Sequence, residues 1–171
     1  MGTVFNNSTI VKFNEFNMFT SITSLPGAFR SCPQLQEIGL DNIVNGSGAT
    51  AITQINSTKI EYAYLPNWVG FTGNRTRFFA SLKYGLRIGK KCTDITNIVQ
   101  SSSTPYFIIE SEMVVGRSGS YANADHFFVP DAFVDAYKAD SQWSSVAAKI
   151  YPISSFVQMF PNEPARMYEP W

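Results

Sequence analysis

Short runs of β-forming residues recur along the chain, and this recurrence is the feature that most constrains its fold. Each run has β-branched or aromatic side chains at alternate positions. Clusters of Gly, Pro, Asn or Ser, which favour turns, lie between many of the runs. The runs are Ile22–Leu25, Ile38–Leu40, Ile60–Leu65, Arg77–Leu82, Ile95–Val99, Tyr106–Ile109 and His126–Val129. Many short strands with regular turns fit a sandwich, a barrel or a solenoid.

A degraded internal repeat favours the solenoid. The repeated pattern is a cysteine with aliphatic residues three and six positions later, in Cys32-Leu35-Ile38 and Cys92-Ile95-Ile98. A small buried residue at a corner, followed by inward aliphatic residues, suits stacked repeats, because each repeat buries its face only against the next. The two cysteines fit no zinc or thioredoxin spacing. The repeat favours two separate buried thiols, with a disulfide as the alternative.

Two stretches resemble a known family. The sequence ITSLPGAFRSCPQLQEI, residues 22–38, resembles the BspA-like leucine-rich repeats of gut Bacteroidetes and their phages. The stretch FVPDAFVDAYKA (128–139), followed by Trp143 and AKIYPI (148–153), is similar to the terminal cap of these proteins. The resemblance covers about residues 10–40 and 92–153 and is poor across about 41–91.

This resemblance implies a mainly β fold: a short leucine-rich-repeat solenoid with a small helical C-terminal cap. The implied domains are a repeat domain over 1–153, which includes the cap over 129–153, and an extended Pro/aromatic tail over 154–171.

Charge and hydropathy narrow the possible partners and compartments. The formal net charge is zero, so nothing global directs the chain to nucleic acid or to an anionic membrane. No apolar run approaches the length of a membrane span. Met1 leads into a polar stretch rather than a signal peptide. We therefore expect either a piece trimmed from a secreted protein of the bacterial cell surface, or a complete cytoplasmic product that becomes part of a phage virion.

Residues that could carry out chemistry are few, and no enzyme is expected. His126 is the only histidine, so a histidine-based metal site is excluded, and we expect it at the start of the last strand. Glu110 and Glu112 could act as the paired carboxylates of a glycosidase, but a solvent-facing strand edge explains them better. The stretch 116–120 lacks the final glycine of a nucleophile elbow. With no P-loop or dinucleotide fingerprint, we expect no cofactor and no metal.

A basic, aromatic window over residues 62–93 departs from the family and is the predicted partner-binding region. It contains no acidic residue but six Lys and Arg residues. Arginine beside exposed aromatic rings is common at interfaces with proteins, sugars and anions. Alternatively, the rings fill an enlarged core and the bases only keep the surface soluble. The predicted binding residues are Arg75, Arg77, Lys83, Arg87, Trp68, Phe71 and Tyr84.

The tail is the second departure. The prolines of residues 154–171 disfavour a helix, and a free tail with this many aromatic rings would expose apolar surface that tends to associate with other molecules. We therefore expect it to lie extended along its own surface or that of a neighbouring subunit. The predicted assembly residues are Phe160, Met167, Tyr168 and Trp171.

Three classes of function compete. The leading hypothesis is a non-enzymatic surface recognition module of the BspA-like leucine-rich-repeat type, which binds a protein or a glycan. The alternative is a phage virion structural protein, such as a head fibre, decoration or tail component, whose tail mediates assembly. An enzyme is the least favoured class. We expect a homo-oligomer or a larger assembly, with no nucleic-acid partner and no membrane insertion.

Overall fold

The computed structural model describes residues 9–14, 29, 32–47, 55, 57, 59–72, 78–99, 104–117 and 124–169. Its strands are β1 (Lys12–Phe13), β2 (Glu37–Ile38), β3 (Asn45–Ser47), β4 (Tyr62–Leu65), β5 (Gly70–Thr72), β6 (Gly85–Ile88), β7 (Thr104–Ile109), β8 (Ala124–Val129) and β9 (Ile150–Pro152). Its helices are α1 (Val134–Ala139), α2 (Phe156–Met159) and the 3-10 turns η2 (Asp131–Phe133), η3 (Ser144–Lys149), η4 (Ile153–Ser155) and η5 (Ala165–Met167).

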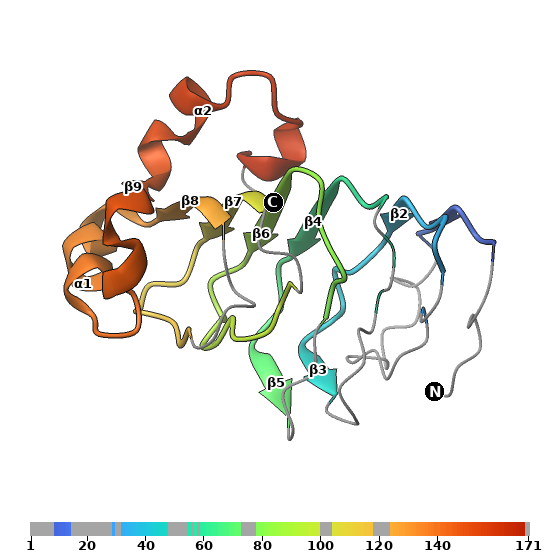
Figure 1. Ribbon diagram of the computed structural model, residues 1–171, viewed down its shortest axis with the longest axis horizontal. Coiled ribbons are helices and arrows are strands. Elements are labelled where there is room, and N and C mark those ends of the chain that lie inside the picture. The colour runs from blue at the N-terminus through green and yellow to red at the C-terminus, as the bar shows by residue number, and fades with distance from the viewer. Residues whose placement is uncertain are drawn as a thin grey trace.

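The centre of the fold is a five-stranded parallel sheet in the order β4-β6-β7-β8-β9 (Figure 1). The register places Gly85 of β6 opposite Tyr62 of β4 on one side and Tyr106 of β7 on the other. Two smaller parallel pairs, β1 with β2 and β3 with β5, lie outside this sheet. Because the strands run parallel, their carboxyl ends lie at one edge of the sheet.

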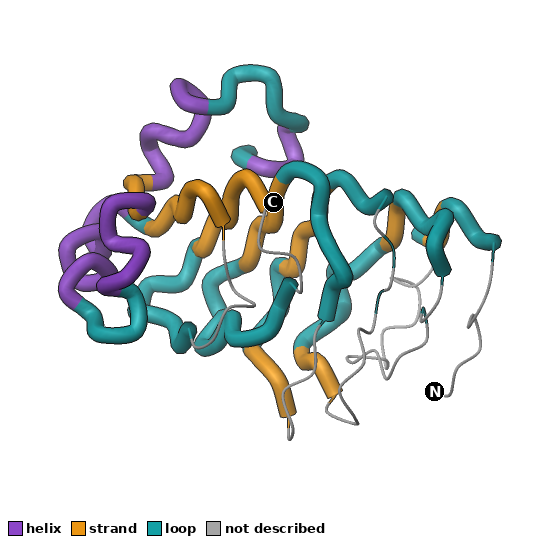
Figure 2. Tube along the Cα trace, in the orientation of Figure 1, coloured by secondary structure: helices purple, strands orange, loops and turns teal. Residues whose placement is uncertain are grey.

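The expected fold class is wrong. The sequence predicted a mainly β leucine-rich-repeat solenoid, whereas the structure is an α/β fold with a five-stranded parallel sheet and few helices. The prediction extended the local cysteine and aliphatic spacing to the whole chain. That spacing indicates which side chains are buried, but the layers of a fold depend on long-range pairing and on where helices form. In the described residues the helices lie in the C-terminal part (Figure 2).

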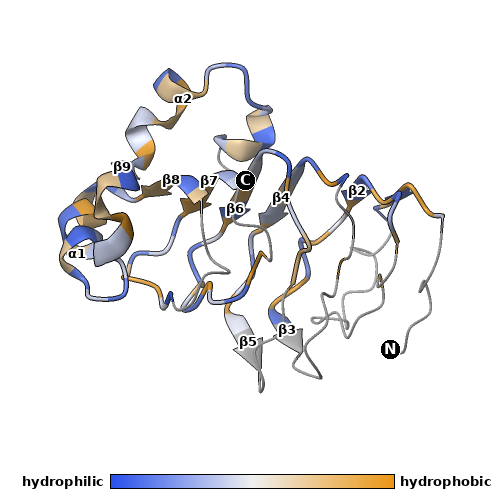
Figure 3. Cartoon of the chain, in the orientation of Figure 1, coloured by the Kyte–Doolittle hydropathy of each residue, from blue (hydrophilic) through white to orange (hydrophobic). Residues whose placement is uncertain are grey.

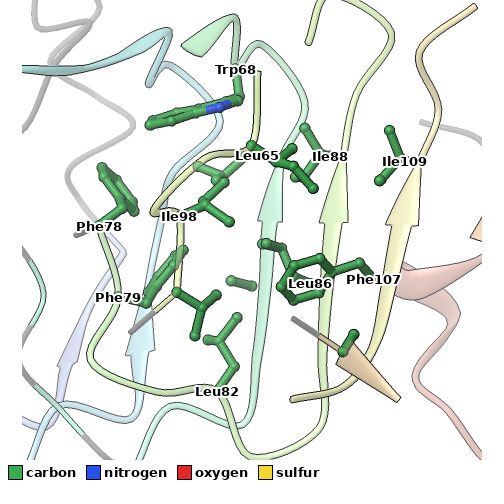
Figure 4. Close-up of a cluster of buried hydrophobic side chains, with 14 of the residues drawn as sticks. Leu65, Trp68, Phe78, Phe79, Leu82, Leu86, Ile88, Ile98, Phe107 and Ile109 are labelled. Carbon is green, nitrogen blue, oxygen red and sulfur yellow. The ribbon is translucent and has the colours of Figure 1, made fainter. Parts of the chain in front are cut away.

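The sheet buries both of its faces, and alternate residues of its strands belong to two different clusters. Leu86 and Ile88 of β6 and Phe107 and Ile109 of β7 point into the main core. Figure 4 shows them gathered with Phe78, Phe79 and Leu82. We call this side the inner face. Cys32 and Cys92 belong to the same core as buried thiols that are not joined in a disulfide, which confirms the expectation of two separate thiols.

The opposite side, which we call the outer face, carries a second cluster. Its strand residues are Tyr106, Ile108 and Phe128. Residues 153–169, which we call the C-terminal segment, leave β9 and return over this face, and the segment contributes the buried Phe156 and Met167 (Figure 1). Figure 3 shows hydrophobic residues interspersed with hydrophilic ones along it.

The C-terminal segment differs from the extended tail expected from the sequence, because it contains α2 and η5. The prolines that were expected to prevent helices lie outside these turns. Residues 156–159 contain no proline, and Pro164 stands at the N-cap of η5, where its missing N–H costs no helical hydrogen bond.

Between β8 and β9, helix α1 and turn η3 pack against the end of the main core. The Tyr137 hydroxyl donates a hydrogen bond to the Met113 carbonyl at 2.9 Å. The Trp143 indole N–H donates to the Val115 carbonyl at 2.9 Å, and the two rings meet edge to face at 4.9 Å. None of the described helices is long and apolar enough to cross a membrane.

Candidate functional site

The outer face is the candidate site, because the C-terminal segment leaves a hollow on either side of Met167. Groove 1 has a volume of about 730 Å³ and is lined by Lys12, Gln36, Glu37, Ile38, Lys59, Glu61, Tyr62, Ala63, Tyr64, Lys83, Pro164, Arg166 and Met167. Groove 2 has a volume of about 690 Å³ and is lined by Tyr64, Pro66, Arg87, Gly89, Lys90, Lys91, Ile108, Glu110, Ile153, Ser154, Phe156, Val157, Met167 and Tyr168. Tyr64 and Met167 line both grooves, so these two side chains lie between them.

A buried arginine holds the C-terminal segment on the sheet. Arg87, only 4% exposed, donates from Nε to Glu110 Oε1 at 2.8 Å. Its Nη1 donates to the carbonyls of Arg166 at 2.9 Å and Glu169 at 2.7 Å. The guanidinium also lies 4.9 Å from the centre of the Tyr64 ring. One side chain therefore joins two strands to the end of the segment, and Glu110 faces Arg87 rather than the expected solvent edge.

Tyrosine hydroxyls converge on Glu163 of the C-terminal segment. Tyr106 donates to Glu163 Oε2 at 2.9 Å. Burial raises the pKa of Tyr106 above its ordinary range, and the bond to Glu163 raises it further. The pKa of Tyr62 is raised by the same two causes. Both hydroxyls therefore stay protonated near neutral pH and serve as donors.

Groove 1 is edged by polar side chains that hold one another in place. Lys12 pairs with Glu37 at 2.9 Å and Lys83 with Glu61 at 3.0 Å, in both cases with the side chains about half exposed. Hydrogen bonds from Lys12 and Asn14 lower the pKa of Glu37, which keeps its carboxylate charged. The parallel register explains the first pair directly, because it places Lys12 opposite Glu37. Lys59 donates to the neutral side chain of Gln34.

Aromatic rings lie beside these polar pairs. The rings of Tyr62 and Tyr84 stack with their centres 5.1 Å apart, and both are partly exposed. The Lys83 ammonium lies 4.6 Å from the centre of the Tyr84 ring. Hydrogen bonds to Tyr84 and Glu61 raise the pKa of Lys83, so its charge is retained.

Groove 2 has a different character. Its walls are mainly apolar and come from Ile108 on the sheet and from Ile153, Phe156, Val157, Met167 and Tyr168 on the C-terminal segment. Lys90 and Lys91, both exposed, belong to its lining as well. They follow β6, so they lie at the carboxyl edge of the sheet, where Lys90 pairs with Glu112 at 3.3 Å.

The predicted partner-binding residues separate into three groups. Lys83, Tyr84 and Arg87 lie on or beside the outer face, although Arg87 is buried rather than exposed. Trp68 belongs to the main core, where its indole N–H donates to the Asp94 carbonyl at 3.3 Å. Phe71 is the middle residue of β5. Arg75 and Arg77 lie outside the described residues.

The predicted assembly residues also differ in their surroundings. Phe160 packs beside Phe156 and Tyr106, and Met167 is buried at 1% exposure. Tyr168 is 39% exposed, and Trp171 lies outside the described residues. His126 lies within β8 rather than at its start, and its ring meets Phe160 edge to face at 5.4 Å.

Sequence reasoning missed most of groove 1, namely Lys12, Glu37, Lys59 and Glu61. In the sequence, none of these four residues differs from an ordinary surface residue. Strand pairing brings Lys12 to Glu37 and Lys83 to Glu61, and this long-range pairing cannot be read from local composition. The buried Arg87 did have a signal. It interrupts an apolar strand between Leu86 and Ile88, and a charge in such a place requires a partner.

The described residues contain no group of three or more His, Cys, Asp or Glu side chains that could hold a metal ion. Burial raises the pKa of the Cys92 thiol to about 12, which disfavours the thiolate that a nucleophile needs. The grooves are instead suited to hydrogen bonding and packing. The chain matches no family model, and no curated protein matches it. The resemblance to BspA-like repeats therefore stays a prediction.

Proposed function

We propose that the protein is a non-enzymatic recognition module and that groove 1 binds an acidic oligosaccharide. The observation that carries this proposal is the polar edge of groove 1. Lys12, Lys59, Lys83 and Arg166 stand there beside two carboxylates, Glu37 and Glu61. Paired donors and acceptors that are already held in place lose little entropy when they bind hydroxyl groups. Four cationic side chains against two carboxylates give the groove a surplus of positive charge, and Lys59 donates to the neutral side chain of Gln34 rather than to one of these carboxylates.

The lining of groove 1 favours a sugar over a protein surface. Protein interfaces depend on apolar or aromatic anchors that become buried at their centre. Val11, Met113, Val157, Met159 and Tyr168 are the exposed large hydrophobic residues of the described chain. None of these five lines groove 1. The partly exposed ring of Tyr62 offers an apolar surface to a sugar ring, while the lysines offer donors to its hydroxyl and carboxylate groups.

The surroundings of Glu110 and Glu112, the two carboxylates considered above for a glycosidase, support a protein that is not an enzyme. Glu110 is tied to the buried Arg87, whereas Glu112 pairs with the exposed Lys90. These separate ion pairs disfavour a shared role of Glu110 and Glu112 as the general acid and base of a glycosidase, which must flank one bond.

The test is binding of the full-length protein to an array that holds acidic oligosaccharides, containing uronic or sialic acid, beside their neutral counterparts. We expect acidic members to be retained, and we expect retention to fall as salt rises. Lys59→Gln should remove the preference for acidic members. The matched control is Lys149→Gln, an exposed lysine that lies across the fold and pairs with Asp125 at 3.9 Å. Equal retention of neutral and acidic sugars, or none of either, would contradict the proposal.

A further inference from the structure

Exposed apolar side chains gather around groove 2. Val157, 50% exposed, and Tyr168, 39% exposed, both line it. Exposed apolar residues that line a hollow are frequent at protein interaction sites.

Charged residues of both signs frame this apolar area. Lys90 and Lys91 line groove 2, and Glu112 lies beside them through its ion pair with Lys90, in which both side chains are about 70% exposed. We call the set Lys90, Lys91, Glu112, Val157 and Tyr168 the groove 2 patch.

We propose that the groove 2 patch binds a second copy of this chain through a two-fold interface. Such an interface brings the same patch together from both partners, so the patch must complement itself. This one contains a hollow with apolar walls, exposed apolar side chains to fill it, and both cations and a carboxylate. A two-fold contact can place the apolar side chains of each copy against the hollow of the other, with Lys91 facing Glu112 of the second copy. The interface uses a different hollow from the sugar site, so it stands or falls independently of the proposed function.

The first test is the mass of the full-length protein, measured by sedimentation over a range of micromolar concentrations. We expect two chains, with dissociation on dilution. Val157→Asp should raise the dissociation constant at least about tenfold, because it places a charge at the centre of an apolar contact. Val11→Asp is the matched control: Val11 is 42% exposed but does not line groove 2, so this variant should remain a dimer.

The second test uses charge reversal and depends on two-fold symmetry. Lys91→Glu and Glu112→Lys should each weaken self-association about threefold to tenfold, since like charges then meet twice across the interface. An equimolar mixture of the two variants should restore dimers, because each chain then meets the opposite charge at both contacts.

A single-chain mass at every concentration, for a protein whose circular dichroism shows it to be folded, overturns the proposal. Equal weakening by Val157→Asp and Val11→Asp overturns it too, since the interface would not then be centred on groove 2. A mixture that stays as monomeric as its two components excludes the facing of Lys91 and Glu112.

Discussion

At the scale of single residues, the burial of Arg87 has the clearest energetic consequence. A buried ion pair is a weak source of stability, but removal of one partner leaves the other charge without compensation. Removal of the Arg87 side chain would leave the Glu110 carboxylate and the carbonyls of Arg166 and Glu169 without the hydrogen bonds that it donates. We expect Arg87→Ala to lower the free energy of unfolding by about 3 kcal/mol, measured by urea denaturation.

Two companion variants separate charge from geometry at this position. Arg87→Lys retains the charge but loses the fork that reaches several acceptors at once, so its stability should fall between the wild type and Arg87→Ala. Lys83→Ala breaks an exposed pair with Glu61 and should leave the urea midpoint nearly unchanged. If Arg87→Ala and Lys83→Ala lowered the free energy of unfolding by the same amount, the burial of Arg87 would have no effect on stability.

Gly89 and Gly70 differ in the space that an added side chain would have. A Cβ atom added to Gly89 would lie 2.0 Å from the Pro66 carbonyl oxygen, so the backbone itself would have to move. The nearest atom to a Cβ at Gly70 is 3.6 Å away, an ordinary contact. We expect Gly89→Ala to lower the free energy of unfolding by about 2 kcal/mol, and Gly70→Ala to leave it unchanged or slightly higher. Thermal unfolding of both variants measures the difference, and equal midpoints would contradict it.

At the scale of elements, the sequence predicted only some of the strands. In the runs Arg77–Leu82 and Ile95–Val99, the described residues form isolated bridges at Phe79 and Val99 and no strand. The runs Tyr106–Ile109 and His126–Val129 both fall inside strands, β7 and β8. Local composition is also misleading at Asn45–Ser47, a stretch rich in residues that favour turns, which nevertheless forms β3. Pairing with Gly70–Thr72 stabilises β3 from outside, so a partner far along the chain overrides the local preference. The run Ile22–Leu25 lies outside the described residues.

The same limit applies to the candidate site. The basic window directed attention to Lys83 and Arg87, which line the two grooves, because local composition reports where unusual side chains are concentrated. It could not reveal that Trp68 turns inward, since the composition of a stretch does not tell whether an aromatic side chain is buried or exposed. The C-terminal segment that divides the outer face into two grooves depends on contacts between Arg87 and Glu169, far apart in sequence.

The last residues of the C-terminal segment form the element whose local stability is easiest to test. Within residues 161–169, Met167 is the only buried side chain. One buried methionine contributes about 1.5–3 kcal/mol, which is little against the entropy of ordering a stretch of this length. We expect Met167→Ser to release the stretch and to raise the rate of trypsin cleavage after Arg166 about tenfold.

The control for this cleavage is Met159→Ser on α2, where the side chain is 38% exposed and little apolar contact is lost. Its cleavage rate after Arg166 should match the wild type. Mass spectrometry of the released C-terminal peptide measures both variants. Cleavage of the wild type as fast as Met167→Ser would show that Met167 does not hold the stretch.

At the scale of the whole molecule, several weak acids are buried in their protonated forms. Burial raises the pKa of Cys92 from 9.0 to about 12, and that of Tyr64 from 10.0 to about 12. Burial also raises the pKa values of Tyr106 and Tyr137. Each group keeps its proton when folded at a pH where the unfolded chain has lost it. The folded state then binds more protons, so stability falls as pH rises above the unfolded pKa values.

We therefore expect the free energy of unfolding to fall from about pH 9 upward, with each fully shifted group contributing about 1.4 kcal/mol per pH unit. Urea titrations at successive pH values measure the slope. Cys92→Ala should flatten it between about pH 9 and 10, where the thiol of the unfolded chain ionises first. Tyr64→Phe should flatten it only above about pH 10, because the phenol of the unfolded chain ionises later. A general weakening of the core by either substitution would lower the free energy of unfolding equally at every pH and leave the slope unchanged. A change of slope confined to one pH window therefore identifies the group that titrates there. A wild-type curve that stays level through pH 10 would contradict the buried, protonated state of Cys92.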